Sequence, residues 1–137
     1  MSAAAAWELQ TALYQTLSTD TALVALLGGA RVYDDVPPGA DFPYVVIGEN
    51  LNRDWSTGSD TGDEHGLTIH TWSRAAGRKQ SLDLIAAIRA ALDTGTLTLS
   101  QNRVVNLGFE FAQTRLDGDA QTIHGVIRYR VVTEPTP

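Results

Sequence analysis

The sequence contains no cysteine among its 137 residues, which excludes disulfides, thiolate nucleophiles and cysteine-bound zinc. No apolar run approaches the roughly 20 residues that cross a bilayer. The first residues are rich in alanine but carry no basic charge of the kind that opens a secretory signal. These absences predict a soluble, intracellular protein with no membrane segment, and the length predicts one domain.

Positive charge is also in short supply, with ten Lys and Arg against sixteen Asp and Glu. This balance argues against a protein that grips nucleic acid by its phosphates, because that requires a basic surface. The excess is localised: residues 31–66 hold eight acids and two arginines, and the remainder has eight of each sign. Two interpretations stay open, a solvated surface that maintains solubility or a surface that repels a negative molecule or meets a basic partner.

Three segments show the apolar period of an amphipathic helix. They are residues 3–17, residues 21–27 between the N-cap residue Asp20 and Gly28, and residues 80–92. The apolar stripes comprise Ala6, Leu9, Leu13 and Leu17 in the first helix and Leu82, Ile85, Ile88 and Leu92 in the third. We expect the core to include Trp7, Leu13, Tyr44, Leu82 and Ile85.

Strand patterns complete the chain. They cover residues 44–51, 66–72, 96–99, 104–116 and 122–133, and Asp117-Gly118 is a strong hairpin signal. The order predicts an α+β fold, with an antiparallel sheet of about five strands and helices packed on one face. A flexible loop is expected over residues 52–65 and a short Pro-containing tail over 134–137.

Few residues offer catalytic or metal chemistry. The spacing of His65, His70 and His124 matches no metal site, and Asp60 to Glu64 lacks the oxygen spacing of a calcium loop. No nucleophile elbow, phosphate-binding loop or dinucleotide fingerprint is present. We therefore predict no catalytic, cofactor-binding or metal-binding residues, no cofactor, and no enzyme activity.

One remote alternative comes from the tripeptide Asp-Thr-Gly, which occurs at Asp60 and at Asp93. Paired aspartates that share a proton are the chemistry of aspartic proteases. That signature needs a hydrophobic strand before the aspartate, whereas a helical pattern precedes Asp93 and a polar loop precedes Asp60. A helix end and a loop explain both copies without catalysis. A small-ligand-binding α+β domain is a further alternative, although no pocket signature supports it.

Taken in order, several stretches resemble the tail-terminator (tail completion) family of long-tailed phages and gene transfer agents. They are Leu17 to Gly28, Arg31 to Asp34 followed by Pro37 to Gly39, Phe42 to Gly48, Leu67 to Ser73 with the helix 80–92, and His124 to Arg130. No single piece is specific, but the ordered set covers nearly the whole chain. The resemblance implies one tail-terminator-like domain over residues 1–137.

The resemblance also implies a structural virion protein of the tail or neck, assembled in the bacterial cytoplasm. In such proteins several copies, typically six, form a ring at the head-proximal end of the tail tube. The implied partners are further copies of the chain, the major tail tube protein and the head-side connector or stopper. DNA would pass through the ring without specific binding, and no membrane is involved. A head-completion or stopper protein of the same neck region is the nearest alternative.

Two groups of residues are candidates for the interfaces or the lumen of such a ring. The acidic loop would face the lumen or the tube, with Trp55 as an apolar anchor, and the basic cluster would meet an acidic neighbour. The alternatives are a tryptophan folded back onto its own sheet and a solvated helix start. The candidates are Asp54, Trp55, Asp60, Asp63 and Glu64 in the loop, and Arg74, Arg78 and Lys79 in the cluster.

Overall fold

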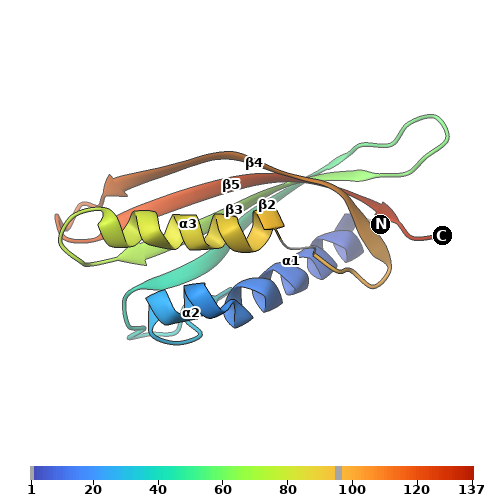
Figure 1. The fold of residues 1–137 in the computed structure, drawn as a ribbon. Helices are drawn as coiled ribbons and strands as arrows, with labels where there is room; N and C mark the ends of the chain where they lie inside the picture. The colour runs from blue at the N-terminus through green and yellow to red at the C-terminus, as the bar shows by residue number, and fades with distance from the viewer. Residues whose placement is uncertain (1, 95–96) are drawn as a thin grey trace.

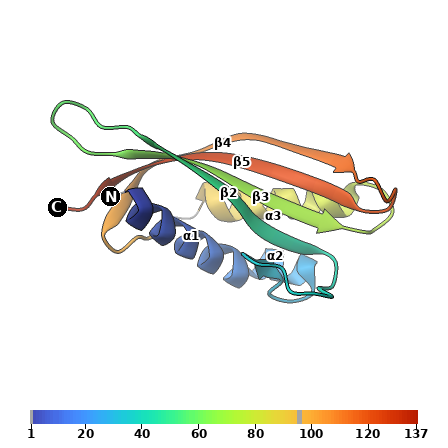
Figure 2. The same ribbon diagram turned by 180° about the vertical axis from the view of Figure 1, so that it is seen from behind.

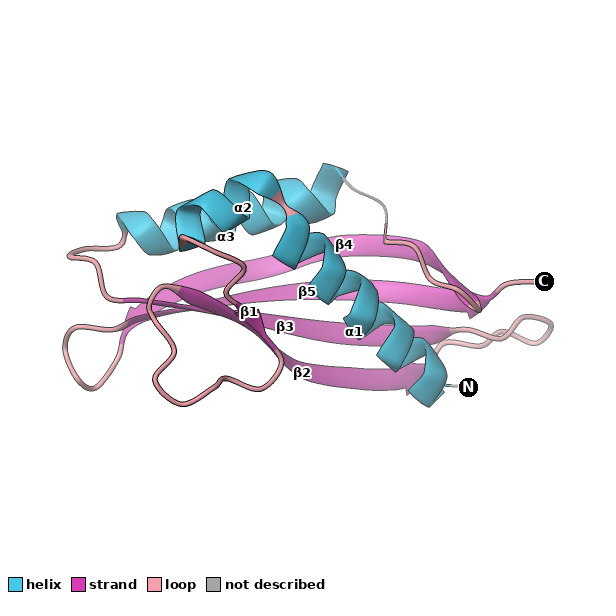
Figure 3. Ribbon diagram, turned by 90° about the horizontal axis from the view of Figure 1, so that it is seen from below, coloured by secondary structure: helices cyan, strands magenta, loops and turns pink. Residues whose placement is uncertain are grey.

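Three helices cover one face of a five-stranded sheet, as Figures 1 and 3 show. The computed structural model describes residues 2–94 and 97–137, and none of the helices in these ranges is long and apolar enough to span a membrane. The predicted α+β fold is confirmed. The elements are α1 (Ser2–Thr19), α2 (Thr21–Leu27), β1 (Val32–Tyr33), β2 (Tyr44–Asp54), β3 (Asp63–Ser73), α3 (Lys79–Thr94), β4 (Asn102–Leu116) and β5 (Ile123–Pro135).

The strands follow the order β1-β2-β3-β5-β4 across the sheet. The four long strands pair antiparallel, but β1 runs parallel to β2, so the sheet is mixed rather than wholly antiparallel. The last strand in the sequence, β5, lies between β3 and β4 (Figure 2). The sheet is therefore bounded by β1 with the free part of β2 on one side and by β4 on the other, and the described helices lie on one of its faces.

Local signals in the sequence set the ends of α2. The carboxylate of Asp20 accepts a hydrogen bond from the backbone N–H of Leu23 at 3.0 Å, which satisfies one of the unpaired donors of the first turn. Gly28 ends the helix with φ +80°, a left-handed conformation that favours glycine, and its N–H donates to the carbonyl of Val24. The short second helix predicted from the sequence is confirmed.

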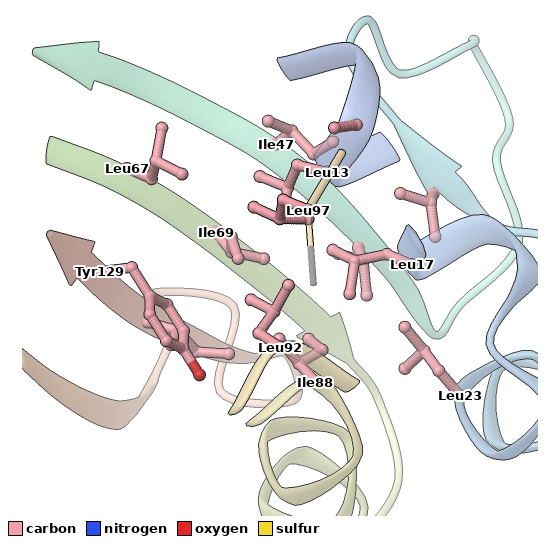
Figure 4. Packing of buried hydrophobic residues seen from close by; sticks show 14 of the residues in the cluster. Leu13, Leu17, Leu23, Ile47, Leu67, Ile69, Ile88, Leu92, Leu97 and Tyr129 are labelled. Carbon is pink, nitrogen blue, oxygen red and sulfur yellow. The ribbon is translucent and has the colours of Figure 1, made fainter. Parts of the chain in front are cut away.

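The core lies between the helices and the sheet (Figure 4). Leu13 and Ile85 are buried as expected and Tyr44 is half-buried, but Trp7 is 65% exposed and Leu82 is 53% exposed. The sheet-facing stripe of α1 is Leu9, Leu13 and Leu17, and that of α3 passes through Leu84 instead of Leu82. Residues 82 and 84 point to nearly opposite sides of a helix, so the predicted stripe was wrong at its first position.

Three boundaries differ from the prediction. Strands β2 and β3 continue to Asp54 and from Asp63, so the loop between them covers 55–62 and not 52–65. Strand β5 extends to Pro135, which shortens the predicted tail. The predicted strand 96–99 is also wrong at 97–99, which form no strand, while residue 96 lies outside the described residues. Leu97 lies in the segment that connects α3 to β4, and its side chain is buried in the core of the protein.

Helix α3 packs closely over Gly125 of β5. A Cβ atom at this position would lie 2.2 Å from Oγ1 of Thr71 and 3.1 Å from Oγ of Ser81. These two hydroxyls face each other between β3 and α3 at 3.4 Å. The absence of a side chain at position 125 therefore allows the helix to lie against the strands.

Candidate interaction surfaces

The face of the sheet opposite the helices carries a row of polar side chains, one from each long strand. Nε2 of His70 (β3) donates to Oε1 of Glu49 (β2) at 2.8 Å, and Nδ1 of His70 lies 2.7 Å from Nε2 of His124 (β5). Because a carboxylate only accepts, Nδ1 of a neutral His70 is left to accept from His124. Arg115 (β4) pairs with His124 in the strand register and completes the row.

An aromatic ring covers this row. Trp72 stacks on His124, with ring centroids 3.9 Å apart and planes 6° from parallel. Burial is the main cause that lowers the pKa of His124, and the charges of His70 and Arg115 act in the same direction. The hydrogen bond from His70 lowers the pKa of Glu49. The row therefore favours an ionised Glu49 and disfavours a proton on His124.

Ion pairs occupy the neighbouring part of the same face. Glu64 (β3) lies 3.4 Å from Nε of Arg53 (β2) and accepts a hydrogen bond from Arg130 (β5). Nε of Arg128 is 3.6 Å from Glu110 (β4). A hollow of about 240 Å³ lies among these side chains. Glu64, predicted as a loop acid, is therefore a strand residue held by two arginines of its own sheet.

Asp63 is the second loop candidate that the structure places in a strand. It begins β3 opposite Asp54 and Thr133 and is 6% exposed, so it is unavailable to a lumen. Its charge raises the pKa of the neighbouring His65, against the larger lowering caused by burial. Nδ1 of His65 donates to Oδ1 of Asn52 at 2.6 Å, and its Nε2 accepts from the hydroxyl of Thr133 at 2.8 Å.

The remaining loop candidates lie on a hairpin that projects beyond the helices (Figure 1). Asp54, Trp55 and Asp60 are exposed, and the Trp55 side chain is 47% exposed. The backbone N–H of Trp55 donates to the carbonyl of Gly62 at 2.9 Å, and its ring packs beside Gly62. The hydroxyl of Ser56 donates to Asp54 at 2.7 Å. The hairpin is an ordered arm that presents two acids and one aromatic side chain.

The three basic candidates have different surroundings. Arg74 lies 4.2 Å above the ring of Phe42, donates to the hydroxyl of Thr122 and approaches Asp119 at 3.6 Å. Lys79 pairs with Asp83 at 2.8 Å one turn along α3. Arg78 is exposed and forms no ion pair with any residue that the structure describes. Arg74 is therefore committed to contacts within the chain, and the three do not act alike.

The outer surface of α1 is the feature that sequence reasoning missed. Trp7 and Tyr14 are 65% and 43% exposed, and they border a mostly apolar pocket of about 220 Å³ against the edge of the sheet. The pocket is lined by Trp7, Gln10, Thr11, Tyr14, Asp34 and Ile47. The seven-residue spacing of Trp7 and Tyr14 places both on one side of a helix, which is a signal that the sequence contains.

Both edges of the sheet are open in the described part of the chain. Strand β4 pairs only with β5 along its 15 residues. Strand β2 is covered on its outer side by β1 only at Val45 and Val46. Exposed apolar side chains occur on both strands, at Leu51 on β2 and at Val105, Phe111 and Leu116 on β4. Open edges with apolar side chains are surfaces on which chains associate.

The protease alternative finds no support in the positions of its two aspartates. Asp60 lies at the hairpin tip, and Asp93 lies in the last turn of α3, where it accepts from the hydroxyl of Tyr129 at 2.9 Å and from Arg89 at 3.0 Å. Neither aspartate follows a strand. Among the described residues no group of three or more potential ligands is placed to hold a metal ion.

Comparison with known proteins assigns the chain to a family. The profile of the family described as tail completion protein gp17 matches residues 11–134. The chain belongs to this family. The tail completion protein gp17 of Bacillus phage SPP1 is 30% identical over 95 residues, which are 68% of this chain and 70% of that protein. The protein is thus a tail completion protein of a phage or gene transfer agent virion, as the resemblance implied.

Two solved structures extend this relationship to three dimensions. A chain in the virion of a native gene transfer agent particle superposes with a TM-score of 0.86 and 35% identity, over 94% of this chain and 96% of that one. The structure of the bacteriophage SPP1 gp17 protein gives a TM-score of 0.62 and 25% identity, over 93% and 89%. The tail completion fold therefore spans nearly the whole chain.

Proposed function

We propose that six copies of this tail completion protein close into a ring at the head-proximal end of the tail tube. The ring ends polymerisation of the tube and joins the tail to the head-side connector, while DNA passes through its lumen. The observation that supports the ring is the pair of open sheet edges, β4 on one side and residues 47–54 of β2 on the other. Different surfaces on opposite sides of a subunit suit the head-to-tail contacts from which rings are built.

The projecting hairpin is the arm that reaches beyond the ring in this proposal. It carries Asp54 and Asp60 as exposed acids and Trp55 as a half-exposed aromatic side chain. Acids at the lumen would repel the phosphates of passing DNA, and the indole would anchor the arm on the tail tube protein. Of the four acids first considered for this role, Asp63 and Glu64 are no longer candidates, because Asp63 is buried and Glu64 is ion-paired.

Electron microscopy of particles from a strain that lacks the gene tests this function. Filled heads beside unattached tails, some overlong or ragged at the head end, are expected from loss of a terminator. Detached tails of normal length with heads that have lost their DNA would instead identify the head-side stopper. Intact, joined particles would overturn both assignments.

The role of the hairpin is tested by complementing the same strain with Asp54→Asn/Asp60→Asn. Reduced joining or reduced DNA delivery is expected, at a normal level of folded protein. The matched control is Asp83→Asn/Asp117→Asn, which removes the same charge from α3 and the β4–β5 turn. Wild-type particle yield and DNA delivery by the hairpin variant would remove the hairpin from the proposal and leave the ring untouched.

A further inference from the structure

The two open edges of the sheet differ in charge. On the β1–β2 side, Asp34, Asp35 and Asp41 are exposed and form no ion pair with any residue that the structure describes. On the opposite side, Asp83, Asp93 and Glu110 are each paired with a basic side chain. The β1–β2 edge therefore presents three acids without an ion pair, whereas the opposite edge presents one among the described residues, Asp117, which is exposed beside Leu116.

Arg115 is an unpaired basic side chain of that second edge. It is exposed near the end of β4, and it forms no ion pair within the described residues. Its neighbour Leu116 is 52% exposed. The two side chains lie on opposite faces of the strand, because Arg115 pairs with His124 of the uncovered face and Leu116 pairs with the core residue Ile123. A cation and an apolar side chain are thus presented together.

The acids and Arg115 lie toward the same end of the sheet. The register runs from Tyr44 through Trp72 and His124 to Arg115, straight across the sheet. Strand β1 runs parallel to β2 and Tyr33 pairs with Val46, so Asp34 lies beside Ile47, about 10 Å along the strands from the level of Tyr44. A rotation about an axis inclined to the strands therefore brings Arg115 of one copy beside the acidic edge of the next.

The apolar partner of Leu116 lies on the same edge as the acids. The pocket of about 220 Å³ between α1 and the sheet has Trp7 and Tyr14 as its aromatic walls, Ile47 at its base and Asp34 in its lining. It opens on the helix-covered side of the sheet, which is the side to which Leu116 points. The apolar pocket and Asp34 at one edge are thus complementary to Leu116 and Arg115 at the other.

We propose that the ring is joined by this contact: Leu116 of one copy enters the Trp7–Tyr14 pocket of the next, and Arg115 pairs with Asp34 and Asp35. The proposal rests on the proposed ring and specifies its subunit interface. Burial of an apolar side chain beside a charge pair gives the contact both affinity and direction. The occupant of the pocket is a second copy of this chain.

Engineered cysteines test the contact directly, because the natural chain has none. Asp35→Cys/Arg115→Cys is expressed in the strain that lacks the gene, and purified particles are treated with a short thiol-to-thiol crosslinker. Denaturing gels should then show a ladder of this chain up to the full ring. Each single variant should stay monomeric, because a head-to-tail contact never brings two identical positions together. The matched control is Asp35→Cys/Ala86→Cys, whose second thiol lies on the exposed side of α3 and should give no ladder.

A charge exchange provides the second readout. Arg115→Glu should prevent joined particles, as should Asp34→Arg/Asp35→Arg, and the combined variant should restore them at least tenfold over either parent. Dimers from a single-cysteine variant would overturn the head-to-tail contact, as would joined, active particles that give no ladder with the cysteine pair. If joined, active particles give no ladder, the proposed ring function stands and only this interface is overturned. Normal particles from the strain that lacks the gene would overturn both the function and the interface.

Discussion

Nδ1 of His70 and Nε2 of His124 lie 2.7 Å apart on adjacent strands, and Trp72 stacks on the second ring. One hydrogen bond joins the two imidazoles, and either the neutral pair or the singly protonated pair can form it. The doubly protonated pair would point two N–H groups at each other. The pair therefore resists a second proton while the sheet is folded.

Acid should destabilise the protein before its carboxylates titrate. Burial lowers the pKa of both His65 and His124, so the unfolded chain takes up protons first as the pH falls through about 6.5. The free energy of unfolding should then decrease, by about 1.4 kcal/mol per pH unit for each proton taken up. Urea denaturation between pH 8 and 5.5 measures this slope. His124→Gln should reduce it, and an unchanged slope would exclude His124 as a cause.

Gly125→Ala should destabilise the fold by about 1–3 kcal/mol. Its Cβ would overlap Oγ1 of Thr71 under α3, where the neighbouring atoms are buried and cannot move away freely. Gly108→Ala is the matched control, since it lies on the next strand and meets only Asn106 at 3.6 Å. Thermal unfolding of both variants checks the prediction, which fails if the two melt together.

Tyr129→Phe should cost about 1–2 kcal/mol of unfolding free energy. The hydroxyl of this fully buried residue donates to Asp93 at 2.9 Å, and its loss removes a bond to a charged acceptor. Burial and Asp93 also raise the pKa of the phenol, so it remains a donor in alkaline solution. Chemical denaturation gives the difference. The same substitution at the 43% exposed Tyr14 should change stability by less than about 0.5 kcal/mol.

Trp55→Ala should separate stability from assembly. The indole is half-exposed on the hairpin, so the free energy of unfolding should change by less than about 1 kcal/mol. Yield of joined particles should fall at least tenfold, because the proposed anchor on the tail tube is lost. Leu82→Ala, which removes an equally exposed side chain from α3, should leave yield unchanged. Equal yields from both variants would contradict the anchor.

Local signals allowed most of the fold to be predicted. The cap at Asp20, the glycine stop at Gly28 and the alternation of β3 each depend on neighbouring residues, and each is confirmed. The wrong core positions lie off the buried stripes of their helices. The stripe of Leu9, Leu13 and Leu17 marks the side of α1 that faces the sheet, and Trp7 lies off it, so its expected place in the core is wrong.

The candidate surfaces were harder to predict because their partners are distant in the sequence. The polar run 52–65 is typical of a loop, yet Asn52 to Asp54 pair with Asp63 to His65 as strands. Glu64 finds its arginine 66 positions away on β5. The histidine row requires the order of strands across the sheet, which no local pattern contains. The charge imbalance of residues 31–66 is visible in the sequence, but the distribution of its acids among the β1–β2 edge, the hairpin and the uncovered face of the sheet is not.

The position of β5 between β3 and β4 also affects the order of events during synthesis. This strand leaves the ribosome last, yet β3 depends on it for a second neighbour and β4 pairs with no other described strand. Until it arrives, the β2–β3 hairpin and β4 remain separate pieces, and the two edges of the sheet have no fixed position relative to one another. A growing chain on a polysome therefore lacks a complete pair of joining surfaces. In the proposed ring, only finished subunits could join, which would protect the tail from being capped by incomplete copies.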